Sequence, residues 1–100
     1  MLRILRIEVE SPWVVLILQG QIVAEWAELL EAECLRLGRS GLRVVLDLSG
    51  VGFMGRSGLE ALGRLSQAGV VIAGCSPLIA DMLEEEGIEV KRKVRDTKDD

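Results

Sequence analysis

The sequence predicts an α/β fold: a mostly parallel sheet with an antiparallel N-terminal edge strand, and helices packed on the sheet. From residue 13 onward, short apolar runs without charge alternate with longer segments of helical periodicity. Strands that alternate with helices in this way form right-handed parallel crossovers. Before residue 13, only Ser11-Pro12 separates an alternating segment from the next apolar run. So short a connection joins two strands only as an antiparallel hairpin.

The first expected strand covers residues 5 to 10, where apolar and charged residues alternate. This alternation predicts that Leu5, Ile7 and Val9 face the core, while the charged residues face solvent. The second expected strand covers residues 13 to 18, a run without charge that is typical of a strand buried on both faces.

The rest of the chain alternates between helical and strand patterns. Glycines that follow the last periodic apolar residue indicate where a helix ends. A serine followed by proline indicates where a helix begins, because the serine caps the helix and the proline occupies its first position. The expected elements are a helix from residue 23 to 37, a strand at 44–48, a helix at 57–67, a strand at 70–73, a helix from 77 to 86, and a short edge strand at 88–90.

The chain of 100 residues predicts a single domain over residues 1–95 with a charged tail at 96–100. Its core is expected to be aliphatic, because Trp13, Trp26 and Phe53 are the only aromatic residues. No apolar run approaches the roughly 20 residues needed to cross a bilayer, so no direct membrane insertion is expected. The N-terminus lacks a continuous signal-peptide core, and we therefore expect a cytoplasmic protein.

The composition argues against several kinds of chemistry. The sequence contains no histidine, which removes the commonest metal ligand and the commonest general base. Cys34 and Cys75 lie far apart within apolar patterns and are expected to be small core residues in a reducing compartment. A net charge of −4 argues against a nucleic-acid partner. We therefore expect no metal site, no cofactor and no enzymatic activity.

Gly50, Gly52 and Gly55 form the pattern G-x-G-x-x-G between an expected strand and an expected helix. A dinucleotide site also requires an acidic residue roughly 20 residues later, and none is found there. Ser57 and Glu60 have the spacing of a capping box, in which each side chain accepts a backbone N–H of the other residue. The glycines are therefore expected to form a tight turn from strand to helix.

The segment from Val44 to Leu62 resembles the corresponding part of a STAS domain, the fold of bacterial anti-sigma factor antagonists. It combines a buried strand, D-L-S, a short loop, F-M, and S-G-L at the start of a helix. Three further segments fit the family in the same order: Leu18-Gln19-Gly20-Gln21-Ile22, Ala73-Gly74-Cys75-Ser76-Pro77 and Gly87-Ile88.

The resemblance implies a regulatory domain without enzymatic activity that binds another protein, with a serine-kinase-type anti-sigma factor as the possible partner. In the antagonists, the kinase docks near the start of the second helix and phosphorylates a hydroxyl there, and the added charge ends docking. Here the position of the usual acceptor is Arg56. Two family aspartates are replaced by Gly55 and Val23. The resemblance therefore predicts a domain that is not switched by phosphorylation at residue 56.

The predicted partner-binding residues are those at the expected turn and helix start: Met54, Gly55, Arg56, Ser57, Gly58 and Leu59. Three hypotheses remain within the family. The domain is an antagonist that has lost its switch, a structural subunit or scaffold of a transport or stress-signalling complex, or a protein phosphorylated at Ser57. A small enzyme or ligand-binding α/β protein is the alternative from another class. Asp47 and Ser57 lack an obvious base in such a protein, and Asp47 is expected to bind backbone groups. The sequence leaves the oligomeric state open.

Overall fold

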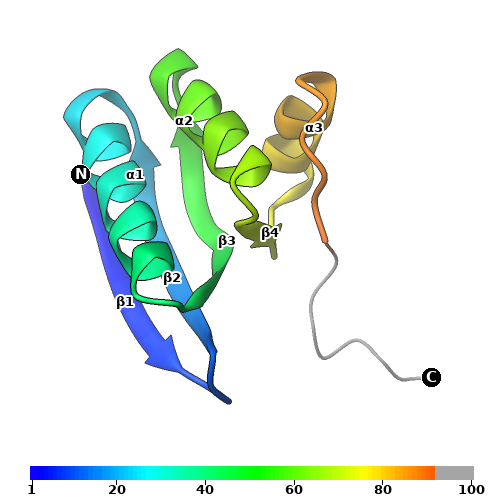
Figure 1. Cartoon of the computed structure of the whole chain (residues 1–100). Coiled ribbons are helices and arrows are strands. Elements are labelled where there is room, and N and C mark those ends of the chain that lie inside the picture. Colours follow the sequence, from blue (N-terminus) through cyan, green and yellow to red (C-terminus); the bar gives the residue numbers. More distant parts are fainter. Residues whose placement is uncertain (92–100) are drawn as a thin grey trace.

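The computed structural model describes residues 1–91 and folds them into a sheet covered by helices (Figure 1). In the described residues the elements, in chain order, are β1 (Leu2–Glu8), β2 (Trp13–Ile22), α1 (Ala24–Arg39), β3 (Arg43–Met54), α2 (Arg56–Gln67), β4 (Val71–Ala73) and α3 (Pro77–Glu85). The tail predicted at 96–100, and the end of the domain predicted at 95, lie outside the described residues.

The four strands of the described chain lie in the order β1-β2-β3-β4. β1 pairs with β2 in antiparallel orientation, whereas β2 with β3 and β3 with β4 are parallel. This mixed sheet confirms the predicted fold class. β3 is longer than expected, because it continues through Gly50 and Gly52 to Met54 with two irregularities in its register with β2. The expected loop is therefore strand, and the turn into α2 is confined to Gly55.

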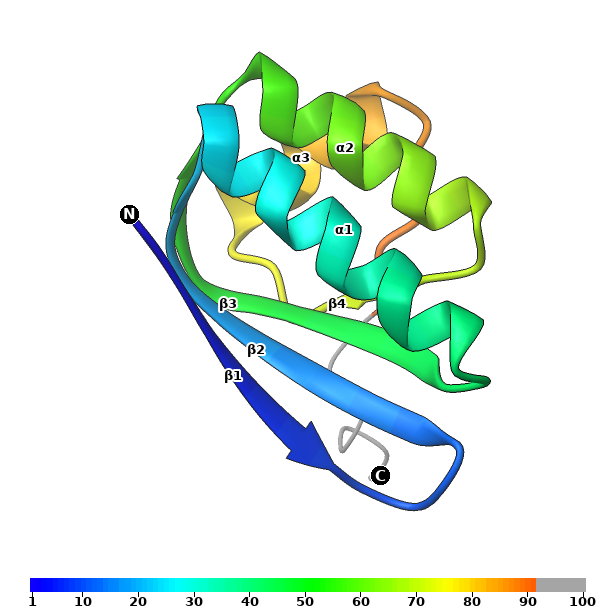
Figure 2. The same ribbon diagram turned by 60° about the vertical axis from the view of Figure 1, so that its left-hand side comes forward.

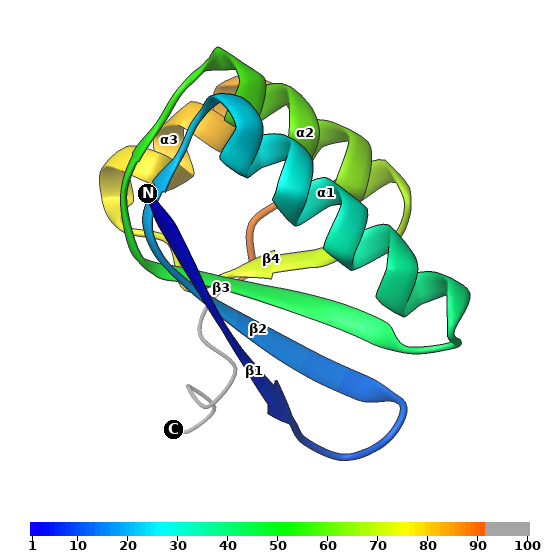
Figure 3. The ribbon, with the colours of Figure 1, turned by 90° about the vertical axis from the view of Figure 1, so that its left-hand side faces the viewer.

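The three helices of residues 1–91 lie on one face of the sheet, as Figures 2 and 3 show from two directions. The core lies between this face and the helices, and it is aliphatic as expected. The largest side chains enclosed there are Leu16, Leu18, Ile22, Leu30, Leu37, Leu46, Leu48, Met54, Leu62, Leu65, Ile72 and Ile79. Among residues 1–91, no helix is both long and apolar enough to span a membrane.

The predicted orientation of β1 is wrong. Leu5, Ile7 and Val9 are 41%, 44% and 52% exposed, whereas Leu2 is buried and Ile4 packs against the core. The reason lies in the register with β2, where Ile4 pairs with the buried Leu18 and Leu5 pairs with Ile17 on the opposite face. The even-numbered residues of β1 therefore face the helices.

The C-terminal part of the described chain follows the prediction less closely. The cap of α3 is confirmed, because the Ile79 N–H donates to Ser76 Oγ (3.4 Å) and Pro77 is the first helical residue. The edge strand expected at 88–90 is reduced, within residues 1–91, to one parallel bridge between Ala73 and Lys91. The Lys91 N–H donates to the Ile72 carbonyl (2.8 Å) in that bridge.

Candidate functional site

Two junctions between a strand and a helix lie side by side at the carboxyl ends of β2 and β3. The chain passes from β2 into α1 at Val23 and from β3 into α2 at Gly55. The Gly55 N–H donates to the Ile22 carbonyl (3.1 Å), which ties the second junction to the first. In open parallel sheets, this end of the strands is where binding sites generally form.

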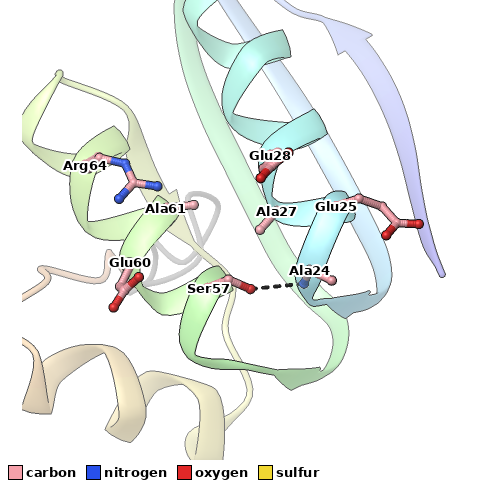
Figure 4. Close-up of a pocket in the computed structure, with 8 residues that line it drawn as sticks. All are labelled: Ala24, Glu25, Ala27, Glu28, Ser57, Glu60, Ala61 and Arg64. Carbon is pink, nitrogen blue, oxygen red and sulfur yellow. Dashed lines mark hydrogen bonds between the residues drawn. The ribbon is translucent and has the colours of Figure 1, made fainter.

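Ser57 connects the two helices instead of capping its own. Its Oγ accepts the N–H of Ala24 (3.0 Å), the first residue of α1, as Figure 4 shows. The predicted capping box is therefore wrong, because the cap residue of α2 is Gly55 and Ser57 lies inside the helix. Ala24 has a φ of 48°, a left-handed conformation that is unfavourable for alanine. The hydrogen bond from Ala24 to Ser57 helps to hold this strained residue in place.

Arg56 is the first residue of α2, and its side chain is 67% exposed. One guanidinium nitrogen lies 3.7 Å from a carboxylate oxygen of Glu86, the residue that follows α3. This pair is long and open to solvent, so its contribution to stability is small. The cation therefore stays accessible at the start of the helix.

The structure separates the six predicted contact residues into two groups. Met54 is buried at the end of β3, and Gly58 and Leu59 are buried within α2 itself. Gly55, Arg56 and Ser57 are partly or fully exposed. Three of the six predicted residues therefore lie below the surface: Met54 is on the buried face of β3, and Gly58 and Leu59 are on the side of α2 that faces the sheet.

Phe53 is a surface residue of this region that the sequence analysis missed. It is the only phenylalanine of the chain, and it is 53% exposed rather than buried in the core. It follows Gly52 near the end of β3, on the opposite side of the strand from the buried Met54. The alternation of a strand would have indicated this position, had β3 been expected to extend to residue 54.

Val23 and Gly55 contact each other across the two junctions. A Cβ atom built on Gly55 would lie 3.3 Å from Val23 Cγ1 and 4.0 Å from a ring carbon of Phe53. Residues 23 and 55, where the STAS resemblance led us to expect aspartates, are therefore neighbours in space. Val23, Phe53 and Gly55 form an apolar border beside Arg56.

An open hollow lies between the first turns of α1 and α2 (Figure 4). It is lined by Ala24, Glu25, Ala27, Glu28, Ser57, Glu60, Ala61 and Arg64. The guanidinium of Arg64 donates two hydrogen bonds to Glu31 (2.7 and 2.9 Å), and this contact lowers the pKa of the Glu31 carboxyl. Since Arg64 is already bound to a carboxylate and the other charged residues of the lining are acidic, the hollow does not favour an anionic ligand.

The two cysteines and Asp47 are held in environments that explain them without a chemical role. Burial raises the pKa of the Cys34 thiol to about 12 and that of Cys75 to about 11, so both are protonated near neutral pH. Asp47 Oδ1 accepts the Ser49 N–H (2.9 Å), as expected for a residue that binds backbone groups. Within residues 1–91, no group of three or more acidic residues or cysteines is arranged to hold a metal ion.

These features define a small α/β domain in which Phe53 and Arg56 are exposed close to the point where two strand-to-helix junctions meet. The sequence profile of the STAS domain family matches residues 5–100, and the chain belongs to that family. A comparison with curated protein sequences gave no match.

Solved structures give the same fold. The anti-sigma factor antagonist SpoIIAA in its unphosphorylated form is 17% identical, with a TM-score of 0.76 over 93% of this chain and 90% of that chain. SpoIIAA of Bacillus in the phosphorylated form is 19% identical, with a TM-score of 0.70 over 93% of both chains. Mglu is 25% identical with a TM-score of 0.54, and the match covers 90% of this chain but 19% of that one.

Proposed function

We propose that the protein is a regulatory binding module without enzymatic activity, and that it docks its partner at the start of α2. The docking surface consists of Phe53, Gly55, Arg56 and Ser57, with Val23 at its border. The observation that supports this proposal best is the placement of Arg56: an exposed cation at the first turn of a helix, three residues after the exposed Phe53. Aromatic and arginine side chains dominate the binding energy of many protein interfaces.

The chemistry of this surface indicates the kind of partner that it fits. Arg56 would pair with a carboxylate of the partner, since a guanidinium matches the two oxygens of a carboxylate. Phe53 would enter an apolar pocket next to that carboxylate. The most specific partner consistent with the family is a serine-kinase-type anti-sigma factor, and an arginine at residue 56 would leave the module permanently able to bind.

A structural subunit or scaffold of a larger complex is the second candidate. The Mglu match is compatible with it, because there a similar fold accounts for 19% of a longer chain and is one part of a larger protein. Such a subunit could use the same surface but would bind its partner without regulation. A small ligand-binding protein remains the third reading, with the hollow between α1 and α2 as its site.

The test is a pull-down from host lysate with tagged protein, in which wild type is compared with Arg56→Glu and Phe53→Ala. Arg39→Glu is the matched control, since Arg39 is an exposed arginine at the far end of α1 and undergoes the same change of charge. We expect both site variants to lose the partner and the control to retain it. Melting temperatures should stay nearly constant, because the substituted side chains are exposed.

Recovery of a serine-kinase-type anti-sigma factor with wild type and Arg39→Glu only would support the antagonist role. Recovery of transporter or signalling-complex subunits would instead favour the scaffold. If Arg56→Glu and Phe53→Ala retain the partner, the docking surface is elsewhere. Mass spectrometry of the protein isolated from its host tests the remaining variant, because a phosphorylated Ser57 peptide would show that the hydroxyl next to Arg56 is modified.

A further inference from the structure

β1 is an edge strand with an unusual surface. It is hydrogen-bonded to β2 on one side, and no other strand of the described chain pairs with its outer side. Its exposed face carries Leu5 and Ile7, and Val9 directly follows the strand. An edge of this kind invites pairing with another strand unless charges or prolines prevent it.

The charges on the helix-facing side of β1 are complementary to each other. Arg6 and Glu8 lie two residues apart on this side, and Arg6 Nη2 is 2.9 Å from Glu8 Oε2. Charges of one sign would repel a second copy in every register. Two opposite charges at this spacing repel it only in some registers, so the register of pairing decides whether the edge is protected or self-complementary.

A second β1 related by a twofold axis perpendicular to the sheet would pair in antiparallel orientation and keep each side chain on its own face. If the axis passes through Arg6 or Glu8, that residue faces its own copy and like charges meet. If it passes through Leu5, Arg6 and Glu8 lie opposite Ile4 and Leu2. Only an axis through Ile7 places Arg6 of each copy opposite Glu8 of the other.

The same register also pairs the exposed apolar side chains. With the axis through Ile7, the two Ile7 side chains face each other, and Leu5 of each copy lies opposite Val9 of the other. We propose that the protein forms a homodimer through β1, in which residues 5–9 of two copies pair in this register and join the two sheets. The charged and apolar faces of the strand favour this register independently, since neither pattern depends on the other.

The surroundings of β1 fit a second copy. A groove open at this edge of the sheet lies between β1 and α1, lined in part by Ile4, Arg6, Leu29 and Glu33. Leu29 is 57% exposed on α1, and a neighbouring copy would cover it from the side. The axis through Ile7 lies toward the hairpin end of the sheet, because Ile7 pairs with Val15. The docking surface at the start of α2 lies at the other end of β2, so the dimer leaves it accessible.

The test uses two charge reversals, Arg6→Glu and Glu8→Arg, with sedimentation velocity of full-length protein over a concentration series. Each variant alone would place two pairs of like charges across the axis, and we expect its dimer to dissociate about ten-fold or more readily than wild type. Mixed in equal amounts, the two variants should form a heterodimer, since every pair across the axis then joins opposite charges. Circular dichroism checks that both variants are folded.

Mixing the two variants distinguishes ion pairs between two copies from the ion pair between Arg6 and Glu8 within one chain. Neither variant regains an attractive pair within its own chain, so a heterodimer can only reflect pairing across the axis. Wild type that dimerises, single variants that do not, and a mixture that does would support the proposal. A wild-type protein that remains monomeric up to about 1 mM, or a mixture that remains monomeric, would overturn it.

Discussion

Replacing Gly58 with alanine adds one methyl group where α2 passes closest to the end of β2. The added Cβ would overlap the Ile22 carbonyl oxygen and would lie 2.8 Å from Met54 Cγ and 3.0 Å from Ile22 Cγ2. The Ile22 carbonyl cannot move away freely, because it accepts the Gly55 N–H. The helix must therefore shift away from the sheet to accept the substitution.

The magnitude follows from two opposing effects. Alanine is favoured over glycine inside a helix by about 1 kcal/mol, whereas overpacking of a tight contact typically costs about 1–3 kcal/mol or more. The contact with a fixed backbone carbonyl places Gly58 at the upper end of that range. We expect a net loss of about 2 kcal/mol in the free energy of unfolding, which lowers the melting temperature by roughly 10 °C.

Gly63→Ala on the same helix is the matched control for Gly58→Ala. Its added Cβ would meet only Ile88 Cδ1 at 3.7 Å, an ordinary contact. The control should therefore gain up to about 1 kcal/mol from helix propensity alone. Urea unfolding of both variants measures the difference. If Gly58→Ala is as stable as Gly63→Ala, the close approach of α2 to β2 does not exist and the reasoning fails.

Two further predictions concern polar contacts. Ser57→Ala removes the acceptor of the Ala24 N–H and should cost about 1 kcal/mol in thermal or urea unfolding, whereas Ser66→Ala on the same helix should cost little; equal effects would contradict a linking role for Ser57. The pKa of Glu31 is lowered from 4.5, chiefly by its hydrogen bonds from Arg64, so the pair stabilises the fold above that pH and less as the pH falls through the lowered value. The difference in unfolding free energy between wild type and Glu31→Gln should therefore be positive at about pH 7 and shrink toward about pH 3, and a constant difference would contradict this account.

Periodicity predicted the order of the elements well. The period of α1 appears directly in the sequence, because its buried residues Ala27, Leu30, Cys34 and Leu37 recur at helical spacing within the helix expected from residue 23 to 37. The cap of α3 was also predictable, because Ser76-Pro77 satisfies a local rule that needs no tertiary contact. Features determined within a few residues of the chain could therefore be predicted from sequence alone.

The orientation of β1 could not be predicted in the same way. Alternation shows that two faces differ, but Leu2 and Ile4 alternate with Leu5 and Ile7 in a strand whose two faces both carry apolar and charged residues. The choice between them depends on pairing with β2, which places Ile4 beside Leu18. A face of apolar residues can therefore be exposed on an edge strand, and periodicity alone does not reveal it.

Dependence on strand pairing also explains why only three of the six residues predicted for the docking surface are partly or fully exposed. Three glycines and a serine before a helix predicted a turn, but β3 continues almost to that helix, and one residue makes the turn. This geometry buries Met54 and exposes Phe53, and it brings Val23 from a different junction against Gly55. An aspartate at residue 55 would have to share that space with Val23. The replacements at 23 and 55 are therefore compatible with each other, and they leave Arg56 beside an apolar border. Under the proposed function, a surface of this kind would attract an acidic partner at all times, whereas a phosphorylated hydroxyl would repel it.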